Sequence, residues 1–166
     1  MKKRNASIAP AIVAGLLVFA AGARAASSAE TPLKNFAELM SAFESGAEVR
    51  AVFHYKSMTL TIDGKVEEKV PDAVGGMALK TWEFFAAGAV GNPDSYVTSS
   101  ENHLIRHPRY GTVLNYVKVS VAASGAVKIL AQYLDPRTFK VEMDETFTTL
   151  IADGANAGAA FFYRLD

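Results

Sequence analysis

The feature that most constrains this fold is a change of hydrophobic period just after Gly46. From Val49, Ala51 and Phe53 onward, apolar residues recur at every second position, and the pattern returns in most segments up to Leu165. A period of two is typical of β-strands with one buried face. We therefore expect a mainly β domain.

The alternating segments are short and are separated by turn signals. Asp63-Gly64 is a strong hairpin signal, and Gly88–Asp94 and Asp135-Pro136 predict further turns. Val74–Ala78 contains two glycines, which we interpret as a turn or bulge that needs positive φ. The expected strands cover residues 49–56, 58–63, 66–70, 77–85, 96–105, 115–121, 127–133, 139–151 and 159–165.

Hairpin-length connections between successive strands favour an antiparallel up-and-down meander. A meander of about eight or nine strands tends to close and remove its edges. We expect a small, calycin-like barrel or a strongly curved sheet, and a barrel of that size either fills with side chains or holds one small ligand.

One amphipathic helix is expected at the N-terminal end of this domain. Phe36, Leu39, Met40 and Phe43 share one helical face, and Gly46 suits the position after the last turn. We place the helix start at Thr31, with Pro32 in the first turn.

The N-terminus has the pattern of a bacterial secretory leader. A basic start precedes the uncharged apolar run Ile8–Ala21, and Ala23-Arg24-Ala25 fits a cleavage site. The run is shorter than the roughly 18–20 residues of a membrane span. We expect a signal peptide over residues 1–25, a flexible linker over 26–30 and one domain over 31–166, in a periplasmic or secreted protein.

The charge balance and the lack of cysteine exclude several function classes. The chain has 17 basic and 17 acidic residues, and loss of the four basic residues of the leader leaves 13 and 17, a net charge of −4. Such a chain lacks the basic surface that nucleic acid needs. Without cysteine there is no disulfide, thiol nucleophile or Cys-ligated zinc. We expect a monomer with no cofactor and no membrane association after cleavage.

The segment Ser99–Tyr110 gathers the most chemistry, since it contains Glu101, His103 and His107. In a strand these three share one face, but the two histidines are about 13 Å apart, too far to hold one metal ion. Glu101 and His103 could form an acid/base pair. The alternative with most weight is a polar strand face carrying a hydrogen-bonded histidine.

Other catalytic signatures are absent from the sequence. It contains no G-x-S-x-G elbow, H-E-x-x-H or P-loop. The aromatic residues could line a pocket, although such residues more often form the core.

The order of several segments resembles the VirK family, small exported bacterial proteins named from a virulence region of plant-associated bacteria. The resemblance runs from about Phe36 to Leu165 and is carried by these segments: LMSAFESGAEVRAV, PDAVGG, SENHLI, NYVKV, AQYLDPRTFKV, DETFTTLI and GAAFFYRL. It implies export, a β-rich single domain and no catalytic residues. It also implies cysteines near two positions where this chain has Ser57 and Thr148 or Thr149, so this chain lacks a bridge that relatives could use.

Three functions remain open from the sequence. The first is a non-enzymatic exported protein that binds a small apolar ligand or a protein partner, with His103, Asn102, Tyr116 and Trp82 as candidate binding residues. The second is a barrel enzyme in which Glu101 and His103 act as acid and base and Asn102 or Tyr116 orients the substrate. The third is an interaction protein that uses an exposed edge strand.

Overall fold

The structure is a computed structural model that describes residues 30–165. The predicted leader and most of the predicted linker lie outside these residues, and Glu30 already begins the first strand. In chain order the elements are β1 Glu30–Leu33, α1 Phe36–Glu44, β2 Glu48–His54, the short 3₁₀ turn η1 Tyr55–Ser57, β3 Thr59–Ile62, β4 Lys65–Val66, β5 Val74–Ala78, β6 Trp82–Phe85, β7 Tyr96–His107, β8 Gly111–Ala122, β9 Ala126–Leu134, β10 Val141–Leu150 and β11 Ala160–Leu165.

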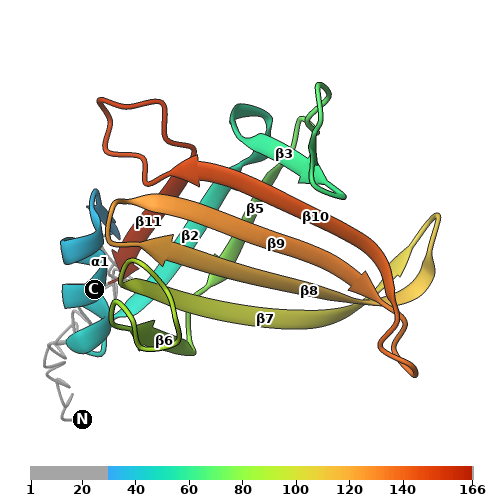
Figure 1. Cartoon of the computed structure of the whole chain (residues 1–166), viewed down its shortest axis with the longest axis horizontal. Coiled ribbons are helices and arrows are strands. Elements are labelled where there is room, and N and C mark those ends of the chain that lie inside the picture. Colours follow the sequence, from blue (N-terminus) through green and yellow to red (C-terminus); the bar gives the residue numbers. More distant parts are fainter. Residues whose placement is uncertain (1–29, 166) are drawn as a thin grey trace, which may run out of the picture.

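The strands form two antiparallel sheets, and neither sheet closes into a barrel (Figure 1). A four-stranded sheet has the order β1-β11-β2-β5, and a seven-stranded sheet has the order β4-β3-β10-β9-β8-β7-β6. The mainly β, antiparallel class is confirmed, and the expected closed barrel is wrong. The physical reason is that the chain leaves one sheet for the other four times, after β2, β4, β5 and β10, so only β6 to β10 form a continuous meander.

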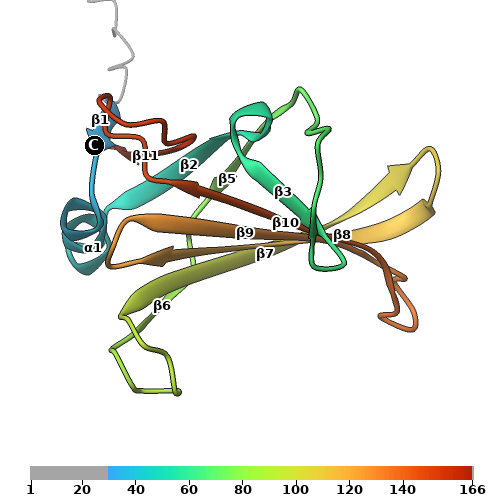
Figure 2. The ribbon, with the colours of Figure 1, turned by 45° about the horizontal axis from the view of Figure 1, so that its top comes forward.

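The segment predicted as one strand over residues 77–85 contains one of these crossings. Met77 pairs with Ala51 in the small sheet, whereas Trp82 pairs with Ser99 in the large sheet. Figure 2 shows β5 and β6 lying in the two different sheets. Alternation continues through Leu79 because both sheets bury a face against the same core, so the pattern does not reveal the change of partner.

The helix is real but starts later than predicted. Asn35 is the N-cap, and its Oδ1 accepts the backbone N–H of Glu38 at 2.9 Å, while the Glu38 carboxylate accepts the backbone N–H of Lys34 at 2.7 Å. This reciprocal capping defines the start of the helix. Thr31 and Pro32, predicted in the first turn, instead pair with β11 in the edge strand β1, so the helix is not the first element.

The core lies between the two sheets and is closed at one end by α1. Leu39, Ala42 and Phe43 are the buried helix residues. The seven-stranded sheet turns one face, here called the inner face, toward the small sheet and the other, the outer face, away from it. Its buried apolar inner-face residues are Leu60, Val97, Val113, Val119, Val121, Val127, Ile129 and Phe147.

The glycines of Val74–Ala78 serve close packing rather than a turn. Gly75 and Gly76 are ordinary residues of β5, and neither has positive φ. A Cβ on Gly75 would lie 2.8 Å from the Tyr55 ring, and one on Gly76 would lie 3.1 Å from the Ala51 carbonyl oxygen. The prediction of a turn or bulge is therefore wrong, because these glycines let neighbouring groups approach the strand.

The predicted Asp63-Gly64 hairpin is confirmed, with φ of 49° and 76° at its two central residues. The returning strand β4 has only two residues. The other edge strands are also short, with four residues in β1 and β6 and five in β5. In the described part of the chain, however, β6 pairs only with Tyr96–Ser99 of β7, so residues 100–107 of that strand form a long edge, and the strand-pairing function considered above stays a prediction. Among residues 30–165, no helix is long and apolar enough to span a bilayer.

Candidate functional site

Glu101 and His103 lie on the inner face of β7 and contact each other. His103 Nε2 is 3.3 Å from Glu101 Oε1. The His103 side chain is 63% exposed and that of Glu101 is 29% exposed. All residues from Tyr96 to His107 pair with β8, so the strand runs two residues beyond the predicted end at Ile105. The structure therefore brings the predicted acid/base pair together, at an open position.

The other predicted site residues do not join this pair. Asn102 pairs with Tyr116 across β7 and β8, and alternation places both on the outer face. Trp82 is in β6, where its ring stacks on Phe43 with centroids 5.0 Å apart. An arrangement in which Asn102 or Tyr116 orients a substrate of Glu101 and His103 is therefore incompatible with the sheet.

His107 has a structural place at the end of β7. Its Nδ1 accepts the backbone N–H groups of Arg109 at 3.1 Å and Tyr110 at 3.3 Å, so it holds the turn into β8. Its ring lies 5.0 Å from the rings of both Tyr110 and Tyr133. These hydrogen bonds occupy one of the two ring nitrogens of His107. In the described part of the chain no three His, Cys, Asp or Glu side chains are grouped to hold a metal ion.

Sequence reasoning missed a second polar group on the inner face, formed by Glu145, Tyr55 and Tyr133. Glu145 follows Met143 and precedes Phe147 on the inner face of β10, and it pairs with Ala131 of β9. Burial raises the pKa of the Glu145 carboxyl. Burial, and then the nearby charge of Glu145, raise the pKa of both the Tyr55 and the Tyr133 hydroxyl. Perturbed groups of this kind gather at functional sites more often than elsewhere.

The same register places this group opposite the predicted pair. Reading across the large sheet, Glu145 aligns with Ala131, Val117 and Glu101. The next row aligns Met143 with Tyr133, Asn115 and His103. Beyond the core, the inner face thus carries Glu101 and His103 on the β7 side and the Glu145 group on the β10 side. Half-buried Ala131 and Val117 lie between them.

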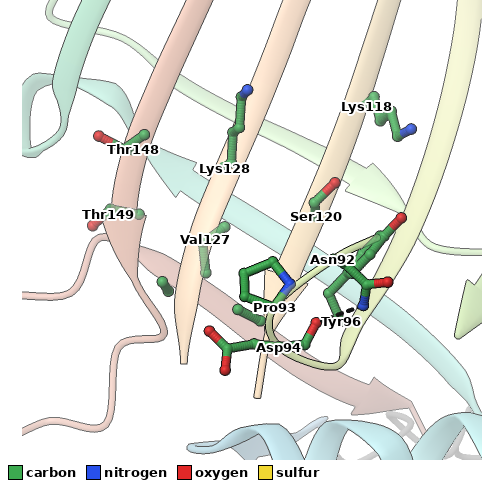
Figure 3. A pocket seen from close by; sticks show the side chains of 12 residues that line it. Asn92, Pro93, Asp94, Tyr96, Lys118, Ser120, Val127, Lys128, Thr148 and Thr149 are labelled. Atoms are coloured by element: carbon green, nitrogen blue, oxygen red, sulfur yellow. Dashed lines mark hydrogen bonds between the residues drawn. The ribbon is translucent and has the colours of Figure 1, made fainter. Parts of the chain in front are cut away.

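A hollow of about 450 Å³ lies on the outer face, beneath the loop that joins β6 to β7 (Figure 3). Asn92 holds this loop, because its Nδ2 donates to the Ala86 and Asp94 carbonyl oxygens at 2.8 and 2.7 Å. Lys118 and Lys128 stand on neighbouring strands at the side away from Asp94. The lining residues are Asn92, Pro93, Asp94, Tyr96, Lys118, Ser120, Ala122, Ala126, Val127, Lys128, Thr148 and Thr149.

A second hollow, of about 590 Å³, lies where the chain crosses between the sheets, and Trp82 is part of its wall. Arg50 and Lys80 also line it, together with Glu48. Of the predicted binding residues, Trp82 is therefore the one placed at a hollow, whereas the lining of both hollows lacks His103, Asn102 and Tyr116.

The comparison with protein families identifies the relatives of this chain. The model described as VirK protein matches residues 32–139, which is more than half of the chain. The chain belongs to the VirK family. This confirms the resemblance inferred from the sequence, and the matched range includes the outer-face hollow's loop, Glu101, His103 and Tyr133, but ends before Glu145.

A solved VirK structure supports the fold assignment. The crystal structure of lpg1832, a VirK family protein from Legionella pneumophila, superposes with a TM-score of 0.60 at 14% sequence identity. The match covers 79% of this chain and 97% of the other. At that identity the likeness concerns the fold alone. A comparison with curated proteins finds no match for this VirK-family chain.

Proposed function

We propose that this VirK-family protein is a non-enzymatic, exported binding protein that takes a small, largely apolar ligand with an acidic group. The observation that carries the proposal is the outer-face hollow of about 450 Å³. That volume lies within the range of about 300–1,000 Å³ typical of ligand sites. Export rests on the basic start, apolar run and Ala23-Arg24-Ala25 of the N-terminus.

The lining supports an apolar ligand body. Ala122 and Ala126 supply small apolar surface, and Tyr96 adds a ring that stacks on Phe85 with centroids 5.0 Å apart. The loop above is held by the Asn92 hydrogen bonds and by the Ala87 N–H bond to Ser95 Oγ. A loop fixed before binding loses less entropy when the ligand enters.

The charges of the lining support an acidic group on the ligand. Neither Lys118 nor Lys128 forms an ion pair within residues 30–165. Both stand away from Asp94, so an acid held between them would avoid that carboxylate (Figure 3). A carboxylate or sulfonate accepts hydrogen bonds from ammonium groups in such a position.

A pair of fluorescent probes tests this function. Anilinonaphthalenesulfonate carries an aromatic body and an acid, and N-phenylnaphthylamine is the same body without the acid. We expect Ala122→Phe, which fills the hollow, to weaken both probes about tenfold, because binding loses its apolar contacts. Thr112→Phe, on the same face at the other end of β8, is the matched control and should bind both probes normally.

The lysines are tested by the difference between the two probes. Lys118→Gln with Lys128→Gln should weaken the sulfonate several-fold and leave the neutral probe unchanged. The proposal is wrong if Ala122→Phe binds both probes as the unchanged protein does. If the proposal holds, native mass spectrometry of protein purified from its own periplasm should detect the natural ligand as a co-purifying mass.

An enzyme remains the alternative function, and the 3.3 Å contact between Glu101 and His103 is the observation in its favour. It lacks the third group that such a site needs, because Asn102 and Tyr116 lie on the other face. The acid/base pair without an orienting partner supports catalysis less well than the hollow supports binding. We therefore rank the enzyme function second.

A further inference from the structure

The inner face carries a half-buried acid that has no cation. In the described part of the chain, no Lys, Arg or His lies within ion-pair distance of Glu145, and no hydrogen bond reaches its carboxylate. Burial raises the pKa of this carboxyl, and no neighbouring positive charge acts against that rise. Removing a charge from water without a partner is costly, so the fold keeps Glu145 at a cost to its own stability.

Two tyrosines, Tyr55 and Tyr133, lie near enough for the Glu145 charge to act on their hydroxyls, and the rings of both pack on other residues. The Tyr55 ring packs on Phe147 with centroids 4.7 Å apart, and Gly75 leaves the room it occupies. The Tyr133 ring is held by His107 at 5.0 Å and by Tyr110 at 5.6 Å. Because their rings are packed, these hydroxyls are positioned before any ligand arrives.

The three polar heads do not satisfy one another. No hydrogen bond joins Tyr55, Tyr133 and Glu145 within residues 30–165, although each tyrosine senses the Glu145 charge. The carboxylate is an acceptor, and each phenol oxygen can also accept. A group with several donors and a positive charge would therefore match what these residues present.

We propose that Glu145, Tyr55 and Tyr133 form a binding site for a primary ammonium group on a small amine. An ammonium has three N–H donors, one for each acceptor, and its charge neutralises the carboxylate. The aromatic ring surface of Tyr55 and Tyr133 adds favourable contact with a cation. This site lies on the opposite face of the sheet from the hollow proposed above and does not depend on it.

The test is a titration of the mature protein with n-butylammonium, followed by NMR at low ionic strength. We expect saturable shifts of the Glu145, Tyr55 and Tyr133 signals. Glu145→Gln should weaken binding about tenfold, because it removes a charge-assisted hydrogen bond. Tyr55→Phe and Tyr133→Phe keep the rings and should each weaken binding about threefold.

Two controls separate a site from a general charge effect. Asp144→Asn removes the same charge from the next residue, whose side chain on the outer face accepts from Gln132, so it should bind n-butylammonium normally. Tetramethylammonium, which has no N–H donor, should bind more weakly than n-butylammonium to the unchanged protein. The proposal is overturned if Asp144→Asn loses as much binding as Glu145→Gln, or if neither changes it.

The stability of the variants gives an independent readout. Since the unpaired charge is costly, Glu145→Gln should unfold at a higher temperature than the unchanged protein while it loses amine binding. Equal stability together with unchanged binding would contradict the site. The Ala122→Phe variant should bind the amine normally, so failure of the outer-face ligand proposal leaves this result unaffected.

Discussion

The near and far halves of the inner face of the large sheet are built by the same four strands, β7 to β10, yet they do different things. The near half, next to α1, packs Val97, Val119, Ile129 and Phe147 against the small sheet. The far half carries Glu101, His103, Tyr133 and Glu145 on the same alternation. The difference is the cover, since the strands of the large sheet continue past the small sheet.

This comparison shows that a period of two states which residues share a face but not whether that face becomes core. Strand length decides the rest. Strands β7 and β8 have 12 residues each, whereas β2 and β5 of the covering sheet have seven and five. In this excess length the polar residues of the inner face are half-buried or exposed, although Val113 on the same face is fully buried.

Shortening one apolar side chain in each half should give the largest difference in unfolding free energy. Ile129 is fully buried, and Ile129→Ala should lower the free energy of unfolding by about 2–5 kcal/mol, through lost apolar contact and a cavity. Val117 lies on the same face but is half-buried, and Val117→Ala should cost about 1 kcal/mol. Urea unfolding with unchanged m values measures both. Equal losses would show that the far half is packed like the core.

The packing of Gly75 against Tyr55 tests the boundary between the two halves. An added methyl group would press on the Tyr55 ring, so Gly75→Ala should cost about 1–3 kcal/mol of unfolding free energy. In a Tyr55→Leu background the same change should cost at least about 1 kcal/mol less, because the shorter side chain leaves room. Chemical denaturation of the four proteins completes the cycle. Additive costs would mean that Gly75 matters for a reason other than Tyr55.

Much of the local structure was predictable because it depends on neighbours in the chain. The face formed by Phe36, Leu39 and Phe43, the Asp63-Gly64 hairpin and the alternation of β7 to β9 follow from spacing and turn chemistry. The crossing between β5 and β6 did not follow, because alternation through Leu79 is the same whichever sheet the strand joins. The closed barrel failed for that reason.

The candidate site divides in the same way. Glu101 and His103 are two residues apart in one strand, so their contact could be predicted from spacing alone. Tyr55 comes from a turn after β2, while Tyr133 and Glu145 come from β9 and β10. Only the register of the sheet and the placement of the turn bring these three together, and neither is written in any local motif. A half-buried acid flanked by apolar Met143 and Phe147 was the one signal available.

The far half should respond to pH through Glu145. Its pKa is raised above the ordinary 4.5, so between 4.5 and the raised value the folded protein binds more protons than the unfolded chain. Stability therefore falls as pH rises through that window and stays lower above it. Glu145→Gln should raise the melting temperature at neutral pH, and the difference should vanish below pH 4.5. Asp144→Asn is the control, and the same pH-dependent gain there would contradict the assignment.

The smallest effect is expected at His103. Its contact with Glu101 is mostly exposed, and such surface pairs contribute between about 0 and 1 kcal/mol. His103→Ala should shift the unfolding free energy by less than about 0.5 kcal/mol. His107→Ala should cost more, about 1 kcal/mol, because it removes the acceptor of two backbone N–H groups in the turn. Thermal and urea unfolding of both variants measures the difference. If His103→Ala costs as much as His107→Ala, the Glu101–His103 pair belongs to a packed unit, and the far half would be less open than its exposed side chains indicate.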